Sequence, residues 1–116
     1  MEKNIVIGVS GASGIAIAAA VLERLQREPG WRSFLVMTKA ARRTAELEYA
    51  PGPEHLMSLA DVNCAPEDLA NSIASGTFRA EGMAIVPCSM KTVAGIVSGF
   101  SENLLLRAAD VTLKER

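Results

Sequence analysis

The chain has 116 residues, of which 49% are hydrophobic and 22% are charged, and these proportions are typical of one globular domain over residues 1–116. Its 12 Lys and Arg residues against 13 Asp and Glu residues give a net charge of −1, which argues against a nucleic-acid-binding surface. Two cysteines, Cys64 and Cys88, and one histidine, His55, are too few for a disulfide framework or a structural zinc site, so we expect no metal.

The start of the chain lacks the apolar core of a secretory signal, and Gly, Ser or a charged residue interrupts every apolar stretch well before 18 residues. We therefore expect no membrane segment and a cytoplasmic location. The chain also contains no G-x-S-x-G elbow, which disfavours the usual serine-hydrolase chemistry.

The first half of the chain has a simple alternating pattern. A continuously apolar, β-branched run predicts a buried parallel strand, and the segment rich in Ala, Leu and Glu that follows a small-residue turn predicts a helix. Pro29 and Gly30 end that helix, and Thr38 is expected to cap the next one. The expected strand, turn, helix, strand and helix cover residues 5–9, 10–14, 15–27, 32–37 and 39–48.

The second half is less regular and ends on a helix. We expect a short helical turn, a short extended piece, a helix start, a third buried strand and two helices over residues 55–60, 61–64, 66–68, 83–87, 88–97 and 103–114. This order predicts a doubly wound α/β sheet with three main strands. Because a crossover helix normally delivers a further parallel strand, we expect either another chain to complete the sheet or the sequence to be truncated at its C-terminus.

Small residues join the first strand to the first helix in the sequence Gly11-Ala12-Ser13-Gly14. Such a turn lets backbone N–H groups approach an anion at the start of a helix. Its spacing differs from the dinucleotide fingerprint and from the phosphate-binding P-loop, so a tight turn without a ligand remains the alternative.

A second polar turn, Pro87-Cys88-Ser89-Met90-Lys91-Thr92, follows the third strand. Taken alone, Ser89 reads as a helix cap and Cys88 as a small buried residue. Ligands in open α/β sheets lie beyond the carboxyl ends of the strands, however, so this turn, the turn at Gly11 and Thr38 are expected to converge on one crevice.

Three charged residues are candidates on weaker grounds. From their positions in the sequence alone, Glu48 and Lys114 are predicted to be solvent-exposed surface charges. Arg107 lies in an apolar helix, where it either pairs with Asp110 three residues on or reaches a phosphate.

Five segments together resemble the UbiX-type flavin prenyltransferases, and most closely the branch formed by the flavoprotein subunits of hydroxyarylic (phenolic) acid decarboxylases. The resemblance runs in the family's order from Ile5 to Glu115. The segments that carry it are residues 11–14, 38–41, 74–78, 87–92 and 107–115.

This resemblance implies a flavodoxin-like fold and large homo-oligomers with sites at subunit interfaces. It implies transfer of a dimethylallyl group from dimethylallyl phosphate to N5 and C6 of reduced FMN, the prenylated FMN then serving a UbiD-type aromatic acid decarboxylase. The catalytic residues it implies are Glu48, as a proton carrier, and Lys114. The FMN contacts it implies are Gly11, Ala12, Ser13, Thr38, Ser89, Met90, Lys91, Thr92 and Arg107.

The family continues beyond the Lys-Glu pair at Lys114 with the residues that hold most of the prenyl donor. We therefore expect the 116-residue chain itself to bind FMN weakly or not at all and to be inactive. Three alternatives stay open: an FMN-dependent cysteine decarboxylase of the same superfamily, a non-catalytic FMN-binding subunit or carrier, and a fragment without a function of its own.

Overall fold

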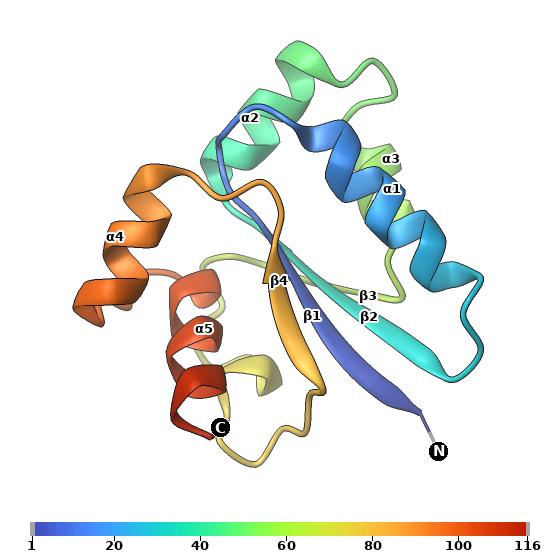
Figure 1. The fold of residues 1–116 in the computed structure, drawn as a ribbon. Helices are drawn as coiled ribbons and strands as arrows, with labels where there is room; N and C mark the ends of the chain where they lie inside the picture. The colour runs from blue at the N-terminus through green and yellow to red at the C-terminus, as the bar shows by residue number, and fades with distance from the viewer. Residues whose placement is uncertain (1, 116) are drawn as a thin grey trace.

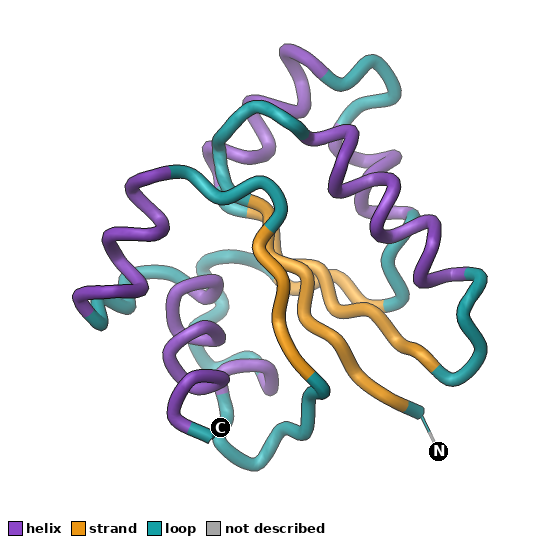
Figure 2. The backbone as a smooth tube through the Cα atoms, viewed as in Figure 1, coloured by secondary structure: helices purple, strands orange, loops and turns teal. Residues whose placement is uncertain are grey.

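The computed structural model describes residues 2–115 as a parallel sheet with helices on both faces (Figures 1 and 2). The strands are β1 (Lys3–Val9), β2 (Trp31–Met37), β3 (Val62–Cys64) and β4 (Gly82–Ile85). The helices are α1 (Ile15–Gln26), α2 (Lys39–Glu48), α3 (Pro53–Ser58), α4 (Met90–Ser98), α5 (Leu104–Lys114) and the 3-10 turn η1 (Ser72–Ala74).

The strand order is β3-β2-β1-β4, and all three pairings are parallel. Alternate residues of β1 and β2 face opposite sides of the sheet, as strand geometry requires. Ile7 and Leu35 pack under α1, α2 and α3, whereas Val6 and Phe34 pack under α5 and η1. Two helical layers therefore cover the sheet, as the doubly wound prediction required.

Local signals explain why most elements agree with the sequence prediction. Helix α2 has the predicted bounds because Thr38 caps it, with its Oγ1 accepting a hydrogen bond from the N–H of Ala41 at 3.0 Å. The bounds of α1, α4 and α5 lie within a residue or two of the prediction.

The extended piece predicted at 61–64 forms β3, which pairs with β2 over three residues and adds a fourth strand to the three main strands predicted. One prediction for the middle of the chain is wrong. The helix start predicted at Pro66 forms successive turns instead, and only η1 follows. Residues 66–71 lack the apolar stripe that would hold a helix on the sheet, and the carbonyl of Pro66 instead accepts from the N–H of Leu104 at 2.8 Å.

The carboxyl ends of the parallel strands lie together at one end of the sheet, where the first turns of α2 and α4 are found (Figure 1). Strand β4 forms the outer edge and is only half-buried, in contrast to β1 and β2. Within residues 2–115, the structure has no helix long and apolar enough to cross a membrane.

Candidate functional site

A cleft of about 1170 Å³ opens beyond the carboxyl ends of the strands. Three of the turns that the sequence predicted to converge contribute to it, through Gly11 after β1, Thr38 after β2 and Ser89 after β4. Lys91 and Thr92 of α4 line it as well. The predicted crevice is therefore present, and it brings together residues that lie far apart in the sequence, from Gly11 to Thr92 and beyond.

Three helices begin at this cleft. Thr38, Ser89 and Asn103 are the N-caps of α2, α4 and α5, and all three line the cleft. The N-terminus of each helix carries a partial positive charge and N–H groups without partners inside the helix. Lys39 and Lys91 line the cleft together with Glu67 and Glu102, so the charged side chains balance, and it is the three helix N-termini that suit the cleft to an anionic group such as a phosphate.

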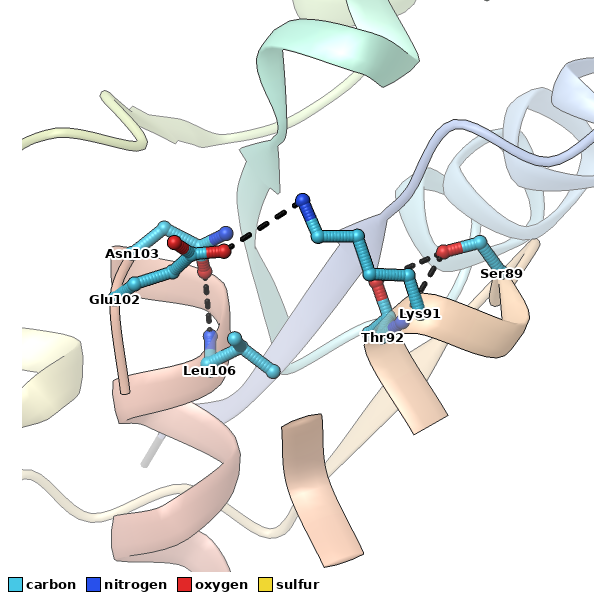
Figure 3. Close-up of polar contacts among 6 residues, drawn as sticks. All are labelled: Ser89, Lys91, Thr92, Glu102, Asn103 and Leu106. Atoms are coloured by element: carbon cyan, nitrogen blue, oxygen red, sulfur yellow. Dashed lines mark hydrogen bonds and ion pairs between the residues drawn. The ribbon is translucent and has the colours of Figure 1, made fainter. Parts of the chain in front are cut away.

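The caps also fix the local geometry of α4 and α5. Ser89 Oγ accepts from the N–H of Thr92 at 3.2 Å and donates to Thr92 Oγ1 at 3.1 Å. Asn103 Oδ1 accepts from the N–H of Leu106 at 2.9 Å. Figure 3 shows these two helix starts facing each other, with Lys91 of α4 extended toward Glu102 at 3.7 Å.

Gly11 must be small because the first turn packs directly on α2. A Cβ atom at Gly11 would lie 2.7 Å from the Cβ of Ala40, closer than side chains approach in proteins. The hydroxyl of Thr44 donates to the carbonyl of Gly11 at 2.9 Å and holds the turn against the helix. Gly11 therefore has a packing role in addition to any role in binding.

Glu48 ends α2 but binds the start of α1. Its Oε2 accepts from the N–H groups of Gly14 at 2.8 Å and Ile15 at 3.1 Å, where the N-cap Gly14 has no side chain. The hydrogen bond from Gly14 lowers the pKa of Glu48 most, with further lowering from Ser13 and Ile15, so the carboxylate is ionised at neutral pH. The N-terminus of α1 therefore already has an anionic partner, the carboxylate of Glu48.

The other predicted site residues do not line the cleft. Ala12 and Ser13 follow Gly11 in the turn, and Ser13 is exposed beside Glu48. Met90 is 80% exposed at the start of α4. Their predicted contacts with FMN stay predictions.

Two predicted residues of α5 point to solvent. Arg107 is exposed one turn into the helix, and its alternative partner, Asp110, pairs with Lys114 at 3.6 Å. Lys114 is the last residue of α5, roughly 15 Å from the start of that helix at 1.5 Å per residue. Within this chain the structure does not bring Lys114 to the cleft.

Sequence reasoning missed the segment between α4 and α5. Phe100, Glu102 and Asn103 line the cleft together with Pro66 and Glu67 from the loop after β3. An Asn directly before an apolar helix is a capping signal that would have identified Asn103. No local sequence signal predicts that Pro66 lies at the cleft, because its position depends on the long-range hydrogen bond between its carbonyl and the N–H of Leu104.

The cysteines and the histidine lie in environments unsuited to nucleophilic chemistry. Burial raises the pKa of the Cys64 and Cys88 thiols, which keeps them protonated at neutral pH. His55 lies on α3, where its Nδ1 is 3.0 Å from the hydroxyl of Tyr49, and it does not line the cleft. Among residues 2–115, no three His, Cys, Asp or Glu side chains gather as metal ligands do.

Comparison with known proteins identifies this architecture. The Flavoprotein family matches residues 1–116, the whole chain. The chain belongs to the Flavoprotein family. Among relatives in this family, the flavin prenyltransferase LpdB of Lactiplantibacillus plantarum is 48% identical over 114 residues, covering 98% of this chain and 61% of LpdB.

Two solved structures of flavoproteins share the fold closely. AnUbiX (PadA1), solved with FMN and dimethylallyl pyrophosphate, is 43% identical with a TM-score of 0.95 and covers 99% of this chain. A dodecameric FMN-dependent UbiX-like decarboxylase from Escherichia coli O157:H7 is 44% identical with a TM-score of 0.94 and covers 97%. This chain covers 61% of each of those chains.

The likeness confirms the predicted resemblance to UbiX-type proteins and the doubly wound α/β fold. The chain spans between 56% and 61% of the length of the curated relatives that it matches here. What the relatives bind and catalyse is therefore a basis for proposals about the whole protein.

Proposed function

We propose that the whole protein is a flavin prenyltransferase that transfers a dimethylallyl group from dimethylallyl phosphate to N5 and C6 of reduced FMN, releasing inorganic phosphate. The observation that carries this proposal is the convergence of the α2, α4 and α5 N-termini on one cleft, in a chain 48% identical to a flavin prenyltransferase. Both substrates are phosphate esters, and a cleft with three helix N-termini suits such groups.

Residues 1–116 are proposed to form a single FMN-binding domain. The hydroxyls of Thr38, Ser89 and Thr92 and the first N–H groups of α2 and α4 fit the polar end of FMN, because they line the cleft at the positive ends of two helices. Gly11 lines the cleft and lets the first turn pack closely on Ala40 of α2. Reduced FMN supplies the nucleophilic nitrogen and carbon of the reaction.

Glu48 and Lys114 keep their predicted catalytic roles as proposals. Glu48 is ionised beside the turn at Gly14 but does not line the cleft, so accepting the proton that C6 loses would require its carboxylate to leave the N–H groups of Gly14 and Ile15. Lys114 would neutralise charge on the leaving phosphate. Because Lys114 lies at the far end of α5, that role requires the donor, or another subunit, to reach that end of the helix.

Arg107, Ala12, Ser13 and Met90 are proposed to complete the contacts with FMN. All four lie within a few residues of a helix start at the cleft or of the first turn. The proposed recipient of the product is a UbiD-type aromatic acid decarboxylase, and the proposed compartment is the cytoplasm.

A homo-oligomer is proposed as the working form. Helix α4 exposes Met90, Val93 and Val97 on one side, and the adjoining Phe100 is exposed as well. A continuous apolar strip of this kind is typical of a protein interface. The UbiX-like decarboxylase with a TM-score of 0.94 is a dodecamer, which supports self-association as the explanation.

The decisive experiment is anaerobic incubation of the whole protein with reduced FMN and dimethylallyl phosphate, followed by mass spectrometry of the flavin. We expect a flavin heavier by one C5H8 unit, together with free phosphate, and neither when the phosphate ester is omitted. Carbon dioxide release from a cysteinyl peptide without flavin modification would instead identify a cysteine decarboxylase. FMN binding without either product would identify a carrier or non-catalytic subunit.

A further inference from the structure

Ser10 lies between the first and last strand tips and is 1% exposed. It follows β1 directly and precedes Gly11, but it does not line the cleft. Its hydroxyl donates to the carbonyl of Pro87 at 2.8 Å and accepts from the N–H of Ser89 at 2.6 Å. A single side chain thus joins two turns that are 77 to 79 residues apart in the sequence.

The chemistry of this position requires a hydroxyl. Ser10 must satisfy a carbonyl acceptor and an N–H donor at the same time, and a hydroxyl is the small group that donates and accepts through one atom. The backbone N–H of Ser10 also donates to the carbonyl of Pro87, at 3.1 Å. Replacement of Ser10 by alanine would therefore leave mainly the N–H of Ser89 without its partner.

The hydrogen bonds continue from Ser10 into the cleft. Ser89, fixed through its N–H, caps α4 with its Oγ and donates to the hydroxyl of Thr92. The carbonyl of Ser89 accepts from the N–H of Val93 at 3.0 Å and starts the helix. Ser10, Ser89 and Thr92 form one connected network, in which Ser89 and Thr92 line the cleft and Ser10 lies behind them, and Figure 3 shows its Ser89–Thr92 end.

We propose that Ser10 is a positioning residue for the flavin site, which holds Ser89 and the start of α4 in register with the Gly11 turn without touching the ligand. This inference rests on the proposed function, since it assumes that FMN occupies the cleft. A site whose polar groups must converge within fractions of an ångström depends on such supporting bonds.

The test compares Ser10→Ala with Ser33→Ala in the whole protein. Ser33 is a matched control because it is also 1% exposed and its hydroxyl accepts a backbone N–H, that of Asp61, at 3.0 Å, but it lies in β2 away from the cleft. Thermal unfolding records the stability that each variant loses. Flavin fluorescence titration records the Kd for FMN.

We expect Ser10→Ala to weaken FMN binding about tenfold, the effect of one lost hydrogen bond, while Ser33→Ala leaves the Kd unchanged at a comparable loss of thermal stability. Equal Kd values for Ser10→Ala and the unsubstituted protein would overturn the proposal. A similar loss of affinity in both variants would also overturn it, because general destabilisation would then explain the effect.

Amide hydrogen exchange keeps this inference separate from the proposed function. In the unsubstituted protein without FMN, we expect the N–H of Ser89 to exchange more slowly than those of Met90 and Lys91, which begin α4 and have no partner inside the helix. Ser10→Ala should remove that protection. Equal exchange of the three amides in the unsubstituted protein overturns the positioning role, even if Ser10→Ala fails to fold. Failure of the unsubstituted protein to bind FMN overturns the proposed function. The exchange rate of the Ser89 amide still tests the role of Ser10 in that case.

Discussion

Glu48 stabilises the start of a helix to which it does not belong. Its carboxylate accepts from Gly14 and Ile15 of the α1 N-terminus, and these bonds lower its pKa relative to the unfolded chain. A carboxyl group with a lowered folded-state pKa stabilises the protein above its unfolded pKa, and this contribution is lost as the pH falls through the folded pKa. The same residue therefore combines a structural role with its proposed role in proton transfer.

We expect Glu48→Gln to lower the thermal unfolding temperature at pH 7, because the variant loses the charge that faces the positive end of α1. The difference from the unsubstituted protein should close as the pH is lowered below the ordinary range of carboxyl groups. Glu46→Gln is the matched control, since Glu46 is exposed on the same helix. A difference that stays constant from neutral to acid pH would contradict the role of the Glu48 charge.

Sequence reasoning at the scale of residues succeeded where the signal is local. Thr38 and Ser89 were predicted as caps because each is a hydroxyl residue near the start of an expected helix, and both accept the expected N–H groups. Ser10 gave no such signal, since its partners Pro87 and Ser89 lie almost 80 residues away. Glu48 shows the same limit, because its contact with Gly14 depends on how α1 and α2 pack.

Helix α5 depends on a cap that also forms the wall of the cleft. Asn103 Oδ1 accepts from the N–H of Leu106, and Leu104 donates to Pro66 from the loop after β3. Asn103→Ala should lower the free energy of unfolding by about 1 kcal/mol, as loss of an N-cap does, measured by urea denaturation. Asn103→Ser should retain most of that stability because serine also caps helices. Equal stability of Asn103→Ala and the unsubstituted protein would show that the cap contributes nothing.

Helices were easier to predict than short strands for a physical reason. An amphipathic helix repeats its apolar positions over several turns, so α1 and α5 were found almost to the residue. β3 has three residues, too few for a pattern, and it is a strand only because it pairs with β2. The turns after Pro66 were mistaken for a helix because Pro at a helix start is a frequent but ambiguous signal.

At the scale of the molecule, the α/β class followed from the alternation of elements, whereas the strand order did not. The order β3-β2-β1-β4 arises from pairings such as Ile7 with Ala84, which no local pattern encodes. The general rule that ligands lie beyond the carboxyl ends of parallel strands nevertheless located the cleft before the order was known.

The apolar strip on α4 is the expected contact surface of the proposed homo-oligomer. Val97 is 82% exposed, and a charge at this position would prevent burial against a second copy of the chain. We expect Val97→Glu to reduce the oligomer size of the whole protein in size-exclusion chromatography with light scattering. Leu47→Glu is the control, since Leu47 is 83% exposed on α2, outside the strip. An unchanged oligomer for Val97→Glu would assign the interface to another surface.

The 116-residue chain offers FMN a cleft that is wide and incompletely covered. Phe100 on its wall is 57% exposed, and the side chain of Lys91, which also lines the cleft, is 88% exposed. A ligand held on few sides loses much of the burial that gives tight binding. We therefore expect fluorescence titration to show weak or no FMN binding by residues 1–116 alone, and a lower Kd for the whole protein. Equal, tight binding by both would mean that the cleft described by these residues is already the complete flavin site.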